Sequence, residues 1–204
     1  MGLYARFVLP KLLSMAMRQP DLVPFRSRVG TAASGRVLEL GIGPAFNLPF
    51  YGANVVSVVG IDPSPQLLAM AERKREGHRF AVRLIKGTAE ALPMDEGSFD
   101  TVVTTWTMCS VPSAPAVLAE ARRVLRPGGR LLFAEHGRAL EPAVRRWQDR
   151  LDPAWTRVAG GCHMNRPMAE LIANAGFRLE ELRTGHVRGP KVLTFMYEGA
   201  AIPQ

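Results

Sequence analysis

The stretch VLELGIGPAFNLPFYGANVVSVVGID, residues 37–62, decides the fold of this 204-residue chain. An aliphatic run stops at a Gly-x-Gly turn at residues 41–43. Such a turn typically connects a buried parallel strand to the helix that follows it, because glycine permits the turn and lets a ligand approach the backbone. A second apolar run ends on Asp62, whose carboxylate can accept hydrogen bonds from both ribose hydroxyls of an adenosine. The stretch therefore predicts an α/β fold that binds an adenosine-containing cofactor.

The residue that stands where a dinucleotide-binding turn has its third glycine narrows the choice of cofactor. A dinucleotide fingerprint, Gly-x-Gly-x-x-Gly, has its last glycine where this chain has Phe46, which would obstruct a pyrophosphate. The pattern Glu-x-Gly-x-Gly-x-Ala at residues 39–45, with Asp62 after it, instead resembles motifs I and II of class I S-adenosylmethionine-dependent methyltransferases. The resemblance implies that Glu39 organises the loop and the amino end of the methionine moiety.

Two later segments extend the resemblance. Residues 87–93, GTAEALP, resemble the methyltransferase loop that passes the adenine, and residues 125–129, LRPGG, resemble the segment that follows a helix in the same family. The strand expected at residues 101–105 ends where the order of a doubly wound sheet reverses, so Thr105 and Trp106 should face the methyl donor. The resemblance implies S-adenosyl-L-methionine as cofactor, S-adenosyl-L-homocysteine as product and no metal. The predicted cofactor-binding residues are Glu39, Gly41, Ile42, Gly43, Asn47, Asp62, Pro63, Thr88, Ala89, Glu90, Thr105 and Trp106.

The expected architecture is α/β, a Rossmann-like doubly wound sheet of seven strands. The resemblance implies the strand order 3-2-1-4-5-7-6 with the last strand antiparallel. We expect residues 1–30 to form an N-terminal amphipathic helical cap and residues 31–204 to form a class I methyltransferase domain. Within the cap, residues 3–18 read as a helix interrupted near a proline, which packs on the core or lies over the cofactor mouth. Prolines 20 and 24 indicate a linker, and the last strand is expected at about residues 191–198.

Segments in the second half point to a narrower family. Residues 109–111 (CSV), 133–136 (FAEH), 151–155 (LDPAW) and 160–162 (GGC) resemble the methyltransferase-like seven proteins, lipid-associated enzymes that methylate small thiols on sulfur. The resemblance implies a small-molecule acceptor, either a small or apolar thiol or hydrogen sulfide. Two alternatives stay open: a phospholipid (phosphatidylethanolamine) N-methyltransferase, and a non-catalytic adenosine-binding module.

His136 is the predicted catalytic residue. A thiol titrates near pH 8.5, so a neighbouring base or cation increases the fraction of attacking thiolate. His136 follows the fifth expected strand, beside the cofactor mouth, although a purely structural histidine fits the same position. Cys109 and Cys162 are expected to pack in the interior or to line the substrate pocket, and Trp106 and Trp155 to wall the pocket or the core.

Composition limits the partners and the compartment. The formal charge of +8 arises from 26 basic and 18 acidic residues scattered along the chain, which favours a solvated surface over a nucleic-acid groove. The basic N-terminal segment offers peripheral contact with an anionic membrane, at its inner face. Two cysteines form neither a disulfide framework nor a zinc-binding pattern. We therefore expect a cytoplasmic protein with no run long and apolar enough to span a membrane.

Overall fold

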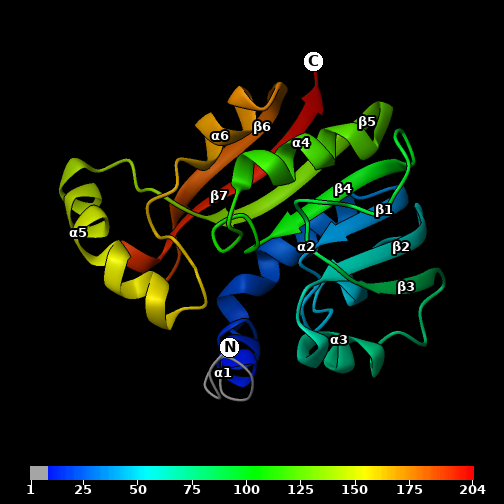
Figure 1. Cartoon of the computed structure of the whole chain (residues 1–204), viewed down its shortest axis with the longest axis horizontal. Helices are drawn as coiled ribbons and strands as arrows, with labels where there is room; N and C mark the ends of the chain where they lie inside the picture. The colour runs from blue at the N-terminus through cyan, green and yellow to red at the C-terminus, as the bar shows by residue number, and fades with distance from the viewer. Residues whose placement is uncertain (1–8) are drawn as a thin grey trace.

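The computed structural model describes residues 9–204, in which seven strands form one sheet in the order β3-β2-β1-β4-β5-β7-β6 (Figure 1). The neighbours β3, β2, β1, β4 and β5 pair in parallel, whereas β7 runs antiparallel to both β5 and β6. The strands are β1 (Gly35–Leu40), β2 (Val55–Asp62), β3 (Ala81–Lys86), β4 (Phe99–Thr105), β5 (Leu125–His136), β6 (Phe177–His186) and β7 (Phe195–Pro203). The predicted fold class and strand order are confirmed.

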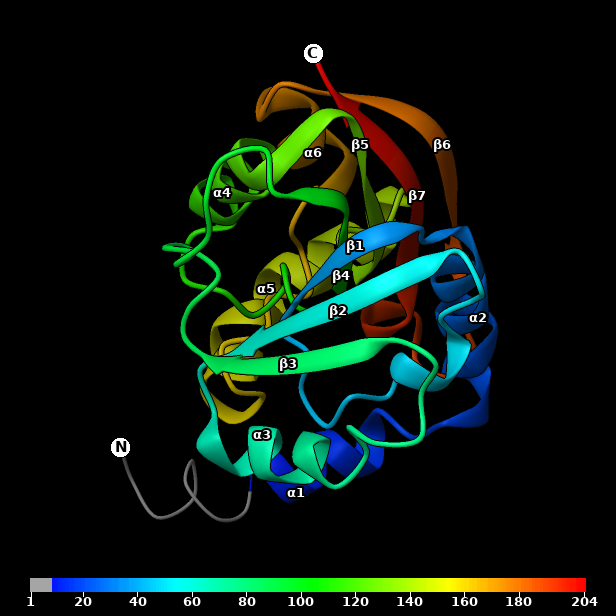
Figure 2. The same ribbon diagram turned by 90° about the vertical axis from the view of Figure 1, so that its right-hand side faces the viewer.

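Helices cover both faces of the sheet (Figure 2). Side chains alternate across a strand, so Val37 and Leu38 of β1 enter different cores. The core around Leu38 is closed by α4 and α6, and the core around Val37 by α2 and α3. The helices are α1 (Leu9–Ala16), α2 (Val23–Ala32), α3 (Pro65–Glu72), α4 (Ala114–Val124), α5 (Pro142–Val158) and α6 (Met168–Asn174), with short 3-10 helices η2 (Pro20–Leu22), η3 (Leu48–Phe50) and η4 (Lys191–Leu193).

The helices that follow β2 and β4 begin with a serine cap and a proline. The Ser64 hydroxyl accepts a hydrogen bond from the N–H of Leu67 at 3.3 Å, and the Ser113 hydroxyl accepts one from Ala116 at the same distance. Each cap satisfies a backbone donor that the first turn leaves without a partner. The caps thus fix where the chain leaves the carboxyl edge of the sheet, which is the edge that carries the site.

Two expectations for the chain's course are wrong. The predicted linker at prolines 20 and 24 is helical, because η2 begins at Pro20 and α2 carries Pro24 in its first turn, where the missing N–H costs no hydrogen bond. The last strand begins at Phe195, after η4, rather than at residue 191. The division at residue 30 stays a prediction. The expected helix at residues 3–18 is described only from Leu9 onward, since residues 1–8 lie outside the described part.

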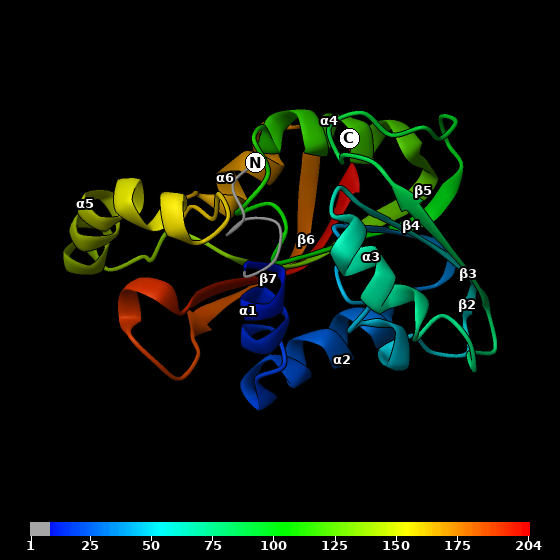
Figure 3. The same cartoon turned by 60° about the horizontal axis from the view of Figure 1, so that its bottom comes forward.

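Helix α5 projects beyond the sheet (Figures 1 and 3) and continues through Pro153 to Val158. The loop that follows it returns to the sheet, where the N–H of His163 donates to the carbonyl of Cys109 at 2.7 Å. The guanidinium of Arg166 also donates to the Val111 carbonyl at 2.7 Å. The loop after α5 is therefore fixed against the loop after β4. Within the part of the chain that the structure describes, no helix has both the length and the apolar character needed to cross a bilayer.

Candidate functional site

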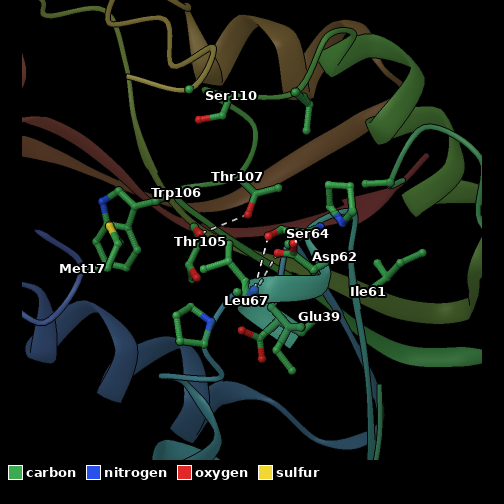
Figure 4. A pocket seen from close by; sticks show the side chains of 18 of the residues that line it. Met17, Glu39, Ile61, Asp62, Ser64, Leu67, Thr105, Trp106, Thr107 and Ser110 are labelled. Carbon is green, nitrogen blue, oxygen red and sulfur yellow. Dashed lines mark hydrogen bonds between the residues drawn. The ribbon is translucent and has the colours of Figure 1, made fainter. Parts of the chain in front are cut away.

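A cavity of about 1030 Å³ lies at the carboxyl ends of β1, β2 and β4 (Figure 4). Parallel strands expose their ligand-binding loops at this edge, and the neighbours β1 and β4 mark the reversal of strand order. Eleven of the twelve predicted cofactor residues line the cavity: Glu39, Gly41, Ile42, Gly43, Asp62, Pro63, Thr88, Ala89, Glu90, Thr105 and Trp106. The structure thus brings together segments that lie up to about 70 residues apart in the sequence.

Asp62 is the last residue of β2 and is 5% exposed. Its Oδ2 accepts a hydrogen bond from the N–H of Gly43 at 3.0 Å, and its Oδ1 accepts one from Ser64 at 2.8 Å. Burial raises the pKa of this carboxyl, and the two backbone donors oppose that rise. A carboxylate offers about four lone pairs, so two remain for ribose hydroxyls.

Glu39 is buried at the base of the cavity. Its two carboxylate oxygens accept hydrogen bonds from Asn47 at 2.8 Å and from the Tyr51 hydroxyl at 2.7 Å. Burial raises the pKa of Glu39 to about 7, against the lowering effects of Tyr51, Arg26 and Asn47. The carboxyl is therefore fixed in position and is poised to ionise near neutral pH.

Asn47 is the one predicted cofactor residue that does not line the cavity. Its side-chain amide donates to Glu39 and, at 2.9 Å, to the Thr105 hydroxyl, and its oxygen accepts from Arg26 at 2.8 Å. It therefore joins the loop after β1 to the end of β4 and to α2. Asn47 positions Glu39 from beneath the cavity floor.

The glycine turn is packed so tightly that a side chain would not fit. Gly41 has φ +64°, and a Cβ there would lie 2.3 Å from the Thr107 hydroxyl oxygen. On the neighbouring strand, a Cβ on Gly60 would lie 2.2 Å from the Ile42 side chain. These contacts explain why the turn needs glycine, and they hold the loop against both flanking strands.

Sequence reasoning missed part of the lining. Leu9, Ser14 and Met17 line the cavity from α1 and its end, so α1 lies beside the opening where the cofactor is expected. The amphipathic pattern of the N-terminal segment was the signal for this contact. The residues of the lining that were not predicted are Leu9, Ser14, Met17, Arg26, Pro44, Phe46, Ile61, Ser64, Pro65, Gln66, Leu67, Lys86, Thr107, Ser110, Val111, Pro112 and Gly160.

Of the residues that form one wall of the cavity, only Trp106 was predicted to bind the cofactor. It is formed by the loop after β4, with Trp106, Ser110 and Val111, and by Gly160 after α5. Figure 4 shows Ser110 across the cavity from Glu39. Trp106 has φ +50°, an uncommon conformation for a bulky residue, and its ring is covered by the Arg26 guanidinium at 4.7 Å. We call this side, Trp106, Ser110, Val111 and Gly160, the acceptor wall.

His136 lies at the end of β5 and is 6% exposed, but it does not line the cavity. Its Nδ1 lies 3.7 Å from the Sγ of Cys162. The Sγ of Cys109 lies 3.4 Å from the Ser110 hydroxyl, so these side chains lie behind the acceptor wall. Hydrogen bonds from Cys109 and His136 lower the pKa of Cys162. The role of His136 as a general base stays a prediction, and the structure places its side chain in the interior and not on the cavity lining.

Comparison with known proteins agrees with this geometry. A family described as a methyltransferase domain matches residues 38–133. The thiol S-methyltransferase TMT1B of Homo sapiens is 38% identical over 158 residues, 72% of this chain and 62% of that protein. A phosphatidylethanolamine N-methyltransferase of Cereibacter sphaeroides is 36% identical over 129 residues, 59% of this chain and 63% of that protein. This chain therefore spans less than two thirds of the length of either relative.

A solved structure supports the fold alone. The crystal structure of an S-adenosylmethionine-dependent methyltransferase of Methanosarcina mazei superposes with a TM-score of 0.68 at 19% identity. The superposition covers 91% of this chain and 97% of that one. At such identity the likeness concerns the architecture, and the chemistry must be argued from the site.

Proposed function

Since this chain belongs to the class I S-adenosylmethionine-dependent methyltransferases, we propose that it transfers the methyl group of S-adenosylmethionine to the sulfur of a small thiol. The observation that carries the cofactor half is the pair of buried carboxyls in one cavity, Asp62 at the end of β2 and Glu39 on β1. The acceptor half is supported by the thiol S-methyltransferase relative at 38% identity.

We infer one group of residues for each part of the cofactor. The free lone pairs of Asp62 accept hydrogen bonds from the ribose hydroxyls, and Glu39 attracts the ammonium group of the methionine moiety. The loop of Thr88, Ala89 and Glu90 would offer backbone donors and acceptors to the edge of the adenine. These residues together would leave the methyl group facing the acceptor wall.

Methyl transfer is an in-line displacement at carbon. The acceptor sulfur must lie about 3 Å from the methyl carbon and opposite the leaving sulfonium sulfur, so alignment contributes much of the acceleration. Trp106 and Val111 give the acceptor wall an apolar surface that suits a thiol and excludes water. The acceptor thiol would release its proton to solvent, and the thiolate sulfur would bond to the methyl carbon as the carbon–sulfonium bond breaks, which gives a neutral methyl thioether and S-adenosylhomocysteine.

The alternative acceptor is an amine lipid head group. It is supported by the phosphatidylethanolamine N-methyltransferase relative, whose identity over its matched region is close to that of the thiol enzyme. Peripheral contact with an anionic membrane, through the basic N-terminal segment, belongs to this alternative. A non-catalytic module that binds adenosine is the third candidate.

One labelling experiment separates these candidates. The purified chain is incubated with methyl-labelled S-adenosylmethionine and either hydrogen sulfide with small alkane thiols, or vesicles of phosphatidylethanolamine with an anionic lipid. Label on the thiols supports the proposal, and label on the lipid alone replaces it with the lipid alternative. Cofactor binding by calorimetry without label on either acceptor would favour the non-catalytic module.

A further inference from the structure

Three side chains with metal-binding atoms meet behind the acceptor wall. They are Cys109 in the loop after β4, His136 at the end of β5 and Cys162 in the loop after α5. Their donor atoms all lie within 4.8 Å of one another, and the Nδ1 of His136 lies 3.7 Å from the Sγ of Cys162. Cys109 and His136 are 27 positions apart in the sequence, and His136 and Cys162 are 26 positions apart, so no short sequence motif indicates the cluster.

The spacing of these atoms matches a tetrahedral metal site. Zinc lies about 2.3 Å from a cysteine sulfur and about 2.0 Å from a histidine nitrogen, which places neighbouring donors roughly 3.6 Å apart at tetrahedral angles. The observed 3.7 Å between His136 and Cys162 agrees with this value. The donor atoms of the other pairs lie within 4.8 Å of one another, so only small side-chain shifts would bring all three donors to an ion.

The interior around the cluster contains polar groups that the protein does not satisfy. Only 6% of the His136 surface is exposed, so this residue is 94% buried. Its Nε2 has no hydrogen-bond partner among the described residues. The indole N–H of Trp155 is buried and has no hydrogen-bond partner among the described residues either. In a zinc-bound form the Nδ1 of His136 would be the ligand atom, so its Nε2 would carry the proton, as the second nitrogen of a metal-bound histidine does.

We propose that Cys109, His136 and Cys162 bind a zinc ion. Two thiolates and one imidazole are soft and borderline donors, which select zinc over magnesium or calcium. Three protein donors leave a fourth position open, as in catalytic rather than structural zinc sites. The ion would also join the loops after β4 and α5, which together form the acceptor wall.

The cluster lies close to the cavity. Ser110, which lines the cavity, has its hydroxyl 3.4 Å from the Cys109 sulfur, and a Cβ on Gly161 would lie 3.1 Å from the Ser110 carbonyl oxygen. A water molecule would complete the donor set in the resting protein. On the proposed function, on which this step rests, an acceptor thiol would replace that water, give its proton to solvent and bind as the thiolate. His136 then serves as a ligand rather than as a general base.

The test measures metal binding without reference to activity. The full chain is stripped with a chelator, and zinc binding is titrated against a chromophoric chelator. Cobalt is then substituted, because its visible bands report tetrahedral geometry and its near-ultraviolet absorption reports thiolate ligands. The ligand variants are Cys109→Ser, Cys162→Ser and His136→Asn. The control is His163→Asn, adjacent to Cys162, whose side chain pairs with Asp152 at 2.8 Å instead of joining the cluster.

We expect one zinc per chain in the wild type and in His163→Asn, and at least about a 100-fold loss of zinc affinity in each ligand variant. Retained S-adenosylmethionine binding shows that a variant is folded. A wild type that binds the cofactor but neither zinc nor cobalt would overturn the proposal, as would ligand variants with wild-type zinc affinity. Added alkane thiol should increase the thiolate-to-cobalt absorption. An unchanged spectrum with a correctly bound cobalt removes the acceptor step and leaves the metal site.

Discussion

The carboxylate of Asp62 accepts a hydrogen bond from the backbone N–H of Gly43 across 3.0 Å, so the end of β2 holds the turn after β1. Asp62→Ala removes this bond and both proposed ribose contacts. Hydrogen bonds to charged groups contribute about 1.5–3 kcal/mol each, so we expect S-adenosylmethionine affinity to fall by roughly 100-fold or more. Calorimetric titration measures the loss. Asp62→Asn keeps one acceptor and should lose less, and unchanged affinity in Asp62→Ala would exclude Asp62 as the ribose ligand.

Cofactor affinity should depend on pH through Glu39. Burial raises its pKa to about 7, so the carboxyl is mostly neutral at pH 6 and mostly ionised at pH 8. Only the ionised form attracts an ammonium group, so affinity for S-adenosylmethionine should rise by up to about 10-fold over this interval. In Glu39→Gln we expect weak binding at pH 8 and a flat profile. An identical rise in that variant would assign the titration to another group.

The raised pKa of Glu39 also determines how the stability of the folded protein changes with pH. A carboxyl whose pKa is higher in the folded state binds more protons there than in the unfolded chain, so stability is lost as pH rises from about 4.5 to about 7. The bound cofactor offsets this loss, because it favours the ionised Glu39. The cofactor should therefore stabilise the protein more at pH 8 than at pH 6, which thermal unfolding with and without S-adenosylmethionine measures.

The tight turn after β1 gives a fourth prediction. Gly41→Ala places a Cβ 2.3 Å from the Thr107 hydroxyl oxygen at a φ of +64°, so both the loop and the Thr107 contact to Leu40 must shift. We expect a loss of about 1–3 kcal/mol in the free energy of unfolding and a weaker cofactor affinity. Gly52→Ala is the matched control, because a Cβ there meets nothing within 4 Å. Equal stability of the two variants in urea would contradict the packing argument.

Most of the residues predicted to bind the cofactor line one cavity because the signals that indicated them are local. A glycine turn after an apolar run and an acidic residue after the next run, Asp62, specify both the strand ends and their chemistry. Asn47 was assigned to the cofactor, but its amide reaches Glu39 and Thr105 beneath the floor, a packing relation that no local pattern encodes. The cluster of Cys109, His136 and Cys162 depends on how three distant loops meet, so the sequence alone indicated no zinc pattern.

Helix α2 shows a different limit. Pro20 and Pro24 read as helix breakers, although a proline in the first turn removes only an N–H that has no partner there. What makes the segment helical is its tertiary surroundings: Val29 is buried against the sheet, and a Cβ on Gly30 would lie 2.6 Å from the Phe50 carbonyl oxygen. Such contacts arise only after η3 and the sheet are in place.

The ion pair that fastens α2 gives the last prediction. Arg28 donates two hydrogen bonds to the carboxylate of Glu198 on β7, at 2.7 and 2.8 Å, and Glu198 is only 7% exposed. Arg28→Ala leaves a nearly buried carboxylate without its partner, but 43% exposure of the arginine side chain moderates the cost. We expect a loss of about 1–2 kcal/mol in urea unfolding, and the exposed pair of Arg75 and Glu72 supplies the control, with Arg75→Ala within about 0.5 kcal/mol of wild type. If the double variant Arg28→Ala with Glu198→Gln recovers none of the loss, the effect belongs to the packing of the arginine stem and not to the ion pair.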